Sequence, residues 1–131
     1  MASATGAFEV LMKTQSNPGQ TDGVTLGRMS LEKRFSGGLV ATSQGEMLTA
    51  MTETKGSAGY VAIERVTGAL HGKKGSFVLQ YSGTMDHGEQ HLSITVVPDS
   101  GSEQLAGITG TLVINIVDGK HFYEFDYSVP A

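Results

Sequence analysis

The stretch LVINIVDGKHFYEFDYSV, residues 112–129, decides the fold of this chain. It holds two runs of β-branched and aromatic residues, which favour strands, on either side of Asp118-Gly119. A two-residue Asp-Gly loop suits a type I′ turn, because that turn needs positive φ at both of its central positions. The stretch therefore predicts a β-hairpin with strands at residues 112–117 and 120–129.

Six more strands are expected before this hairpin, each with apolar side chains at every second position. The first lies around Phe8, Val10 and Met12, which share one face. The others are expected at residues 24–35, 39–51, 60–66, 77–85 and 92–97. Breaks that contain Gly separate them, at residues 17–23, 36–38, 54–57, 71–75, 86–88 and 98–101. Two segments, 47–54 and 101–109, have room for a helical turn.

Eight strands joined by short turns leave few residues for helices, so the apolar faces must pack on one another. They can do so as a sandwich or as a closed barrel, and consecutive hairpins with few long crossovers favour the barrel. Six glycines inside the strands suit corners where a closing sheet bends: Gly27, Gly45, Gly59, Gly68, Gly83 and Gly110. The sequence thus predicts an all-β fold, a closed eight-stranded antiparallel β-barrel that forms a single domain over residues 1–131.

Composition argues against several classes of function. Nine basic against thirteen acidic residues give a net charge of −4, which argues against a nucleic-acid partner. The nearest approach to a basic cluster, Glu32-Lys33-Arg34, is interpreted as a solvated strand face. The absence of Cys excludes disulfides and thiolate metal sites. No apolar run approaches the roughly 18 residues of a membrane helix and no secretory signal is present, so we expect a cytoplasmic protein with no membrane partner.

Several segments, in order along the chain, resemble the bacterial DUF3224 proteins. They are GEML (45–48), GSAGYVAIERV (56–66), GSFVLQ (75–80), SGTM (82–85), VVPDSG (96–101) and DGKHFYEFDY (118–127). The resemblance extends from about Gly6 to Val129. It implies an eight-stranded barrel similar to that of allene oxide cyclase, and it implies no activity, because the function of the family is unknown. Family members often carry His where this chain has Tyr81, which argues against a role that requires imidazole there.

Carboxylates inside strands are the first candidates for chemistry. An acid that points into an apolar barrel has a raised pKa and can serve as an acid, a base or a ligand anchor. Glu46 and Glu64 lie mid-strand among apolar or small neighbours, and Glu124 lies in the aromatic strand. The alternative for each is an outward side chain, or one paired across a strand with Arg28 or Arg65. Alternation leaves Glu64 open, because both faces of its strand carry apolar residues.

Aromatic and methionine side chains are the other candidates for a ligand pocket. The last strand places four rings on one face: His121, Tyr123, Phe125 and Tyr127. They either line a pocket for an amphipathic molecule or pack as core with their hydroxyls bonded at the barrel mouth, and core packing is favoured. Core filling is also favoured for five methionines, with a wall that adapts to ligands as the alternative: Met12, Met29, Met47, Met51 and Met85. Tyr60, on the face of Glu64, and Tyr81 complete the candidates.

No metal or cofactor is expected. The segment Asp86-His87-Gly88-Glu89-Gln90-His91 contains four potential metal ligands. It spans a turn, however, which puts His87 at a solvated tip and His91 on a strand, and the spacing matches no established metal motif.

Three functional hypotheses remain open. The first is a barrel that binds a small apolar or amphipathic ligand, and the second is an isomerase or cyclase that acts by confinement. The third is an oligomeric scaffold with a solid core. A homo-oligomer is expected under all three, because apolar residues lie on faces opposite the expected core: Leu11, Val24, Leu26, Val78 and Val113.

Overall fold

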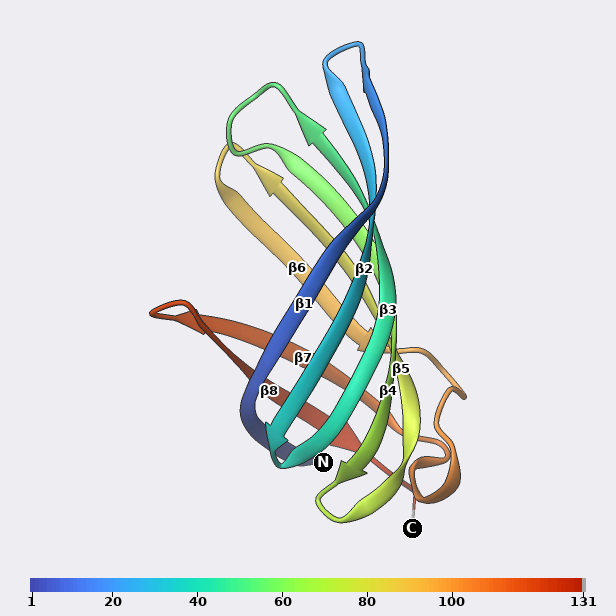
Figure 1. The fold of residues 1–131 in the computed structure, drawn as a ribbon. Helices are drawn as coiled ribbons and strands as arrows, with labels where there is room; N and C mark the ends of the chain where they lie inside the picture. The colour runs from blue at the N-terminus through green and yellow to red at the C-terminus, as the bar shows by residue number, and fades with distance from the viewer. Residues whose placement is uncertain (131) are drawn as a thin grey trace.

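The structure, a computed structural model, describes residues 1–130, apart from the side chains of residues 16–19. Eight strands and one 3₁₀ turn follow one another along the chain (Figure 1). Their bounds are β1 Ala2–Thr21, β2 Val24–Gly37, β3 Leu39–Thr52, β4 Ala58–Leu70, β5 Lys73–Asp86, β6 Glu89–Val96, η1 Glu103–Leu105, β7 Thr109–Val117 and β8 Lys120–Ser128. Within residues 1–130, no helix has the length and apolar character that crossing a bilayer requires.

Each strand pairs antiparallel with the next, and the sheet closes on itself between β8 and β1. The closing ladder runs from Ala2 opposite Tyr127 to Phe8 opposite His121. Closure removes both sheet edges and turns one face of every strand toward a common interior. The predicted eight-stranded barrel is therefore confirmed, and the sandwich alternative is wrong.

The turns follow the glycine pattern with one shift. Asp118 and Gly119, with φ of 50° and 78°, form the predicted hairpin loop between β7 and β8. The first break is later than expected: β1 runs to Thr21, and the chain turns at Asp22-Gly23 alone. Its ladder with β2 takes up the irregularity as register shifts between Thr14 and Gly19. Of the two segments with room for a helical turn, 101–109 contains η1, whereas 47–54 continues β3 to Thr52.

One end of the barrel is filled and closed. Phe77 and Phe125 stack there with ring centroids 5.5 Å apart, and both are fully buried. The chain between β6 and β7 folds across this end and buries Leu105 and Ile108 against the core. Gly75 permits that approach, because a Cβ there would meet the carbonyl oxygen of Ser102 at 2.3 Å. This half, which we call the closed half, contains most of the fully buried side chains.

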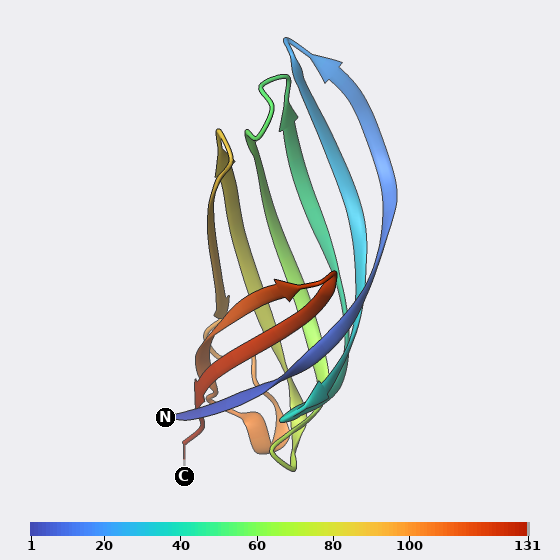
Figure 2. The same cartoon turned by 90° about the vertical axis from the view of Figure 1, so that its left-hand side faces the viewer.

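The other end of the barrel is wide. Strands β1 to β6 extend beyond the short hairpin of β7 and β8, which ends at a lower level (Figures 1 and 2). Strands β6 and β7 share a single ladder pair, Thr95 opposite Thr111, and separate beyond it. We call this end of the molecule the open half. Side chains that point inward here have few neighbours across the barrel.

Candidate functional site

The open half encloses a cavity of about 350 Å³, lined by inward-facing residues of all eight strands. Most of the lining is apolar, with Leu31 and Phe8 low in the barrel and Leu92, Ile114 and Ile116 on β6 and β7. A glycine shapes one wall. A Cβ at Gly83 would lie 2.5 Å from the ring of Tyr60. Because glycine has no Cβ, that ring can lie against β5. Tyr60 lines the cavity and is half-buried.

Methionines form much of the cavity wall. Met12, Met47, Met51 and Met85 all line it, whereas the half-buried Met29 does not. Met12 and Met51 are 48% and 55% exposed although both point inward, so they fill no core. The favoured interpretation of core filling is wrong for these two residues. The reason is the short β7–β8 hairpin, which leaves no wall opposite them.

A buried polar network lies at the floor of the cavity. Glu64 is 0% exposed, and its carboxylate accepts hydrogen bonds from Tyr81 at Oε1 (2.6 Å) and from Ser43 at Oε2 (2.7 Å). Lys33 Nζ donates to the Tyr81 hydroxyl at 2.7 Å and lies 3.3 Å from Glu64 Oε2. Gly45 makes room for Glu64, because a Cβ there would lie 3.1 Å from that of Glu64. Lys33 and Tyr81 also line the cavity, which makes the network its polar floor.

Burial sets the proton affinities of this network. Desolvation lowers the pKa of Lys33, and the nearby Glu64 carboxylate partly opposes that change. The pKa of the Tyr81 hydroxyl is raised well above its ordinary value, first by burial and then by the negative charge of Glu64. Tyr81 therefore stays protonated and can donate to Glu64 while it accepts from Lys33.

Lys33 is the site residue that the sequence analysis missed. The interpretation of Glu32-Lys33-Arg34 as a solvated strand face holds for Glu32 and Arg34, which are exposed on the outer surface. It is wrong for Lys33, which is 8% exposed and points into the barrel. The signal was present in the alternation, because Lys33 lies between Leu31 and Phe35 on the apolar face of its strand.

The three candidate carboxylates divide by strand face. Glu64 points inward, which decides the alternative that its apolar strand left open. Glu46 is on the outer surface and pairs with Arg28, whose Nε lies 3.6 Å from its Oε1, so its place among the pocket candidates is a correction. Its neighbours Gly45 and Met47 take the inward positions of β3 instead. Glu124 is exposed on β8.

The aromatic residues of β8 share the inner face but lie at different heights. His121 lines the cavity. Tyr123 lies in the closed half, where its hydroxyl accepts from the Leu39 amide (2.9 Å) and donates to the Ser36 carbonyl (2.8 Å). Tyr127 lies there too, bonded to Nδ1 of His71 and stacked with Phe125. Tyr123 and Tyr127 were pocket candidates for which core packing was the favoured interpretation; neither lines the cavity, and both are core residues with bonded hydroxyls.

Comparison with known proteins supports one assignment. Residues 4–127 match the family described as "Protein of unknown function (DUF3224)". The chain belongs to the DUF3224 family.

Among solved structures, it is similar to a DUF3224 protein of unknown function from Shewanella oneidensis MR-1. The two are 51% identical with a TM-score of 0.95, over 100% of this chain and 98% of that one. A search of curated proteins found no match. The resemblance to DUF3224 is thus confirmed, and the likeness to allene oxide cyclase stays a prediction.

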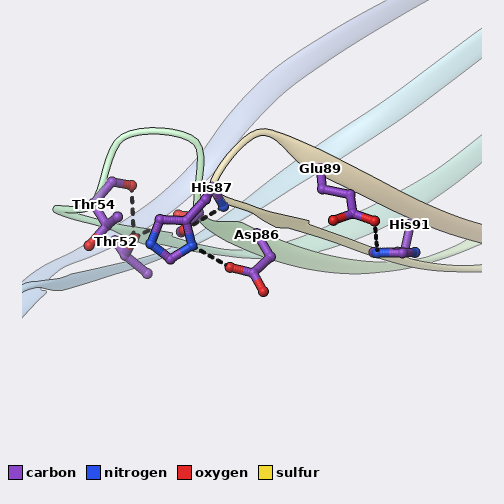
Figure 3. Close-up of polar contacts among 7 residues, drawn as sticks. Thr52, Thr54, Asp86, His87, Glu89 and His91 are labelled. Atoms are coloured by element: carbon purple, nitrogen blue, oxygen red, sulfur yellow. Dashed lines mark hydrogen bonds and ion pairs between the residues drawn. The ribbon is translucent and has the colours of Figure 1, made fainter.

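The rim of this DUF3224 barrel carries polar pairs (Figure 3). His87 contacts Asp86, and His91 Nε2 lies 3.5 Å from Glu89 Oε1, so the four potential ligands form two separate pairs. Among the residues that the structure describes, no group of three His, Asp or Glu is placed to hold a metal ion.

On the outer surface, Leu11, Leu26 and Val113 are exposed, and Val24 and Val78 are partly covered. The homo-oligomer expected from these residues stays a prediction.

Proposed function

We propose that this protein binds a small apolar or amphipathic molecule in the cavity of its open half. The observation that carries the proposal is the exposure of apolar side chains that point inward. Met12, Met51 and Ile116 line the cavity and are 48%, 55% and 64% exposed. In a filled barrel such residues are buried, as their counterparts in the closed half are. Apolar surface gathered in this way is costly in water and is typical of binding sites.

The size and chemistry of the cavity agree with a small ligand. Its volume of about 350 Å³ is near the lower end of the roughly 300–1,000 Å³ that ligand pockets have. The walls are apolar, and a few polar groups converge at the floor, which is the usual arrangement for holding and orienting a ligand. Methionine walls adapt to ligands of different shapes. The same cavity counts against a scaffold with a solid core.

Acid–base catalysis by the carboxylates has less support. Glu46 lies on the outer surface, and Glu64 is fully buried and is not among the residues that line the cavity. Neither carboxylate therefore offers an oxygen to a substrate in the cavity. The isomerase or cyclase hypothesis has no observation of its own in its favour.

The test is a titration with N-phenyl-1-naphthylamine, whose fluorescence rises in apolar surroundings. We expect saturable binding to the native protein. Ala58 lines the cavity, so Ala58→Phe should fill part of it and weaken binding at least about tenfold, the effect of about 1.4 kcal/mol. The matched control is Val61→Phe, which adds the same ring to the exposed outer face of the same strand.

Two results would contradict the proposal. One is the absence of saturable binding to the folded native protein. The other is an equal loss of affinity in Ala58→Phe and Val61→Phe, which would place the probe on the outer surface or trace the effect to β4 as a whole.

A further inference from the structure

The polar floor of the cavity is electrically balanced. The Lys33 ammonium and the Glu64 carboxylate, 3.3 Å apart, cancel each other, and Ser43 and Tyr81 add no charge. Of the lining residues that the structure describes, Lys33 is the one with a formal charge at pH 7 when His is neutral. A ligand that carries its own charge to this floor would leave that charge unpaired in apolar surroundings, which is costly. The floor therefore favours a neutral head group.

The floor also offers a donor rather than an acceptor. Glu64 is fully buried and does not itself line the cavity, and the Tyr81 hydroxyl already accepts from Lys33 and donates to Glu64. The Lys33 ammonium has three N–H bonds but only two oxygen neighbours among the described residues, Tyr81 Oη and Glu64 Oε2. Its other neighbours are the rings of Tyr81 and Phe8, whose centroids lie 4.6 Å and 5.0 Å from Nζ. A ring face is a weaker partner for an ammonium than a carbonyl oxygen is.

We propose that the cavity takes an apolar molecule with a neutral carbonyl group, whose oxygen accepts a hydrogen bond from the Lys33 ammonium. This inference rests on the binding function proposed above and adds the chemical class of the ligand. The carbonyl meets both conditions of the floor, because it brings an acceptor and no charge. The apolar remainder of the molecule lies against Met47, Tyr60 and the other walls above Lys33. Burial lowers the pKa of Lys33, which agrees with a site where an additional charge would be costly.

Three probes with one ring system test the proposal by titration at pH 7. They are 2-acetylnaphthalene, which carries a ketone, 2-ethylnaphthalene, which has no polar group, and 2-naphthoate, which is an anion. We expect the native protein to bind the ketone about tenfold more tightly than the hydrocarbon, the usual effect of one hydrogen bond to a charged group. The anion should bind more weakly than the ketone, because it would add an unpaired charge.

The variant that tests Lys33 is Lys33→Met/Glu64→Gln, which removes both charges and so leaves neither unpaired. We expect it to lose the tenfold preference for 2-acetylnaphthalene over 2-ethylnaphthalene. Lys120→Met, at the exposed first position of β8, is the matched control and should keep that preference. The infrared carbonyl band of 2-acetylnaphthalene bound to the native protein gives a second measurement that needs no variant. A band at lower wavenumber than in hexane is expected for a carbonyl bonded to the ammonium.

The outcomes separate this inference from the function on which it rests. Binding of all three probes with equal affinity, or tightest binding of 2-naphthoate, would leave the binding function in place and overturn the carbonyl. A carbonyl band unshifted from hexane, or a ketone preference that persists in the folded double variant, would overturn the contact with Lys33. Failure of every probe to bind the folded native protein would overturn both proposals.

Discussion

The two halves of the barrel are built from the same alternating strands and have opposite interiors. In the closed half, inward side chains such as Phe77 and Phe125 are fully buried, and η1 and its flanks cover the end. In the open half, inward side chains such as Met51 and Ile116 stay more than half exposed. Alternation thus determines which face a residue takes, whereas the lengths of the neighbouring strands decide whether that face becomes core or cavity. The Lys33–Glu64 network lies between the two halves.

The largest expected effect contrasts one inward residue from each half. Phe125→Ala should lower the free energy of unfolding by about 3–5 kcal/mol, because it leaves a cavity in a filled core. Met51→Ala should change it by less than about 0.5 kcal/mol, since its side chain is already in contact with water. Urea unfolding followed by circular dichroism gives both values. Equal losses would mean that the open half is as tightly packed as the closed one.

The next effect concerns the Lys33–Glu64 pair between the two halves, where the free energy of unfolding should depend on keeping the two charges balanced. Lys33→Met should cost about 3 kcal/mol of unfolding free energy, because it leaves the Glu64 carboxylate buried without its cation. The double variant Lys33→Met/Glu64→Gln should cost less than about 1 kcal/mol, since no charge is left unpaired. Chemical denaturation of the two variants beside Lys120→Met measures this difference. If both variants lost the same amount, the Glu64 carboxylate would carry no penalty when it lacks its cation, contrary to this expectation.

The smallest effect concerns alkaline pH. The pKa of Tyr81 is raised in the folded state, so above about pH 10 the unfolded chain gives up a proton that the folded chain keeps. Stability should therefore fall as pH rises, by up to about 1.4 kcal/mol per pH unit from this residue. Tyr81→Phe removes this contribution, so the free energy of unfolding should depend less steeply on pH. Unfolding measured between pH 10.5 and 11.5 would test this.

That pH range separates Tyr81 from Lys33. The lowered pKa of Lys33 acts in the opposite direction, because stability rises with pH until the unfolded lysine also loses its proton, near its ordinary value of 10.5. Tyr60→Phe is the control, since burial raises the pKa of Tyr60 as well but less than that of Tyr81. Identical slopes for Tyr81→Phe and the native protein would show that this hydroxyl is not held protonated.

Local patterns were enough to predict the strands and their closure, but only part of the site. The face of Lys33 could be predicted, because Leu31 and Phe35 fix the inner face of β2. The face of Glu64 could not, because Val61 and Ile63 on the outer face of β4 are as apolar as the inner residues, and both are about half exposed, at 51% and 52%. A strand with two apolar faces gives alternation nothing to distinguish.

Local sequence patterns could not predict how deep in the barrel each inward-facing residue lies. His121, Tyr123 and Tyr127 share one face, yet only His121 reaches the cavity. Their depth depends on the stagger between β8 and β1, which is a property of strands far apart in the sequence. The cavity itself depends on the short β7–β8 hairpin at one end and on Leu105 and Ile108 at the other. No single segment of the chain carries that information.

The ladder between β1 and β8 has a consequence for biosynthesis. It joins Ala2 to Tyr127, so β1, which is translated before the other strands of this barrel, has no partner along this edge until β8 has been translated. Until then, one edge of β1 stays unpaired and can template pairing with another nascent chain. Successive hairpins can form during translation, because each pairs neighbours in sequence, whereas closure must follow translation of β8. Polysomes that crowd many copies together would therefore favour strand exchange between chains, a hazard that a slower rate of initiation would reduce.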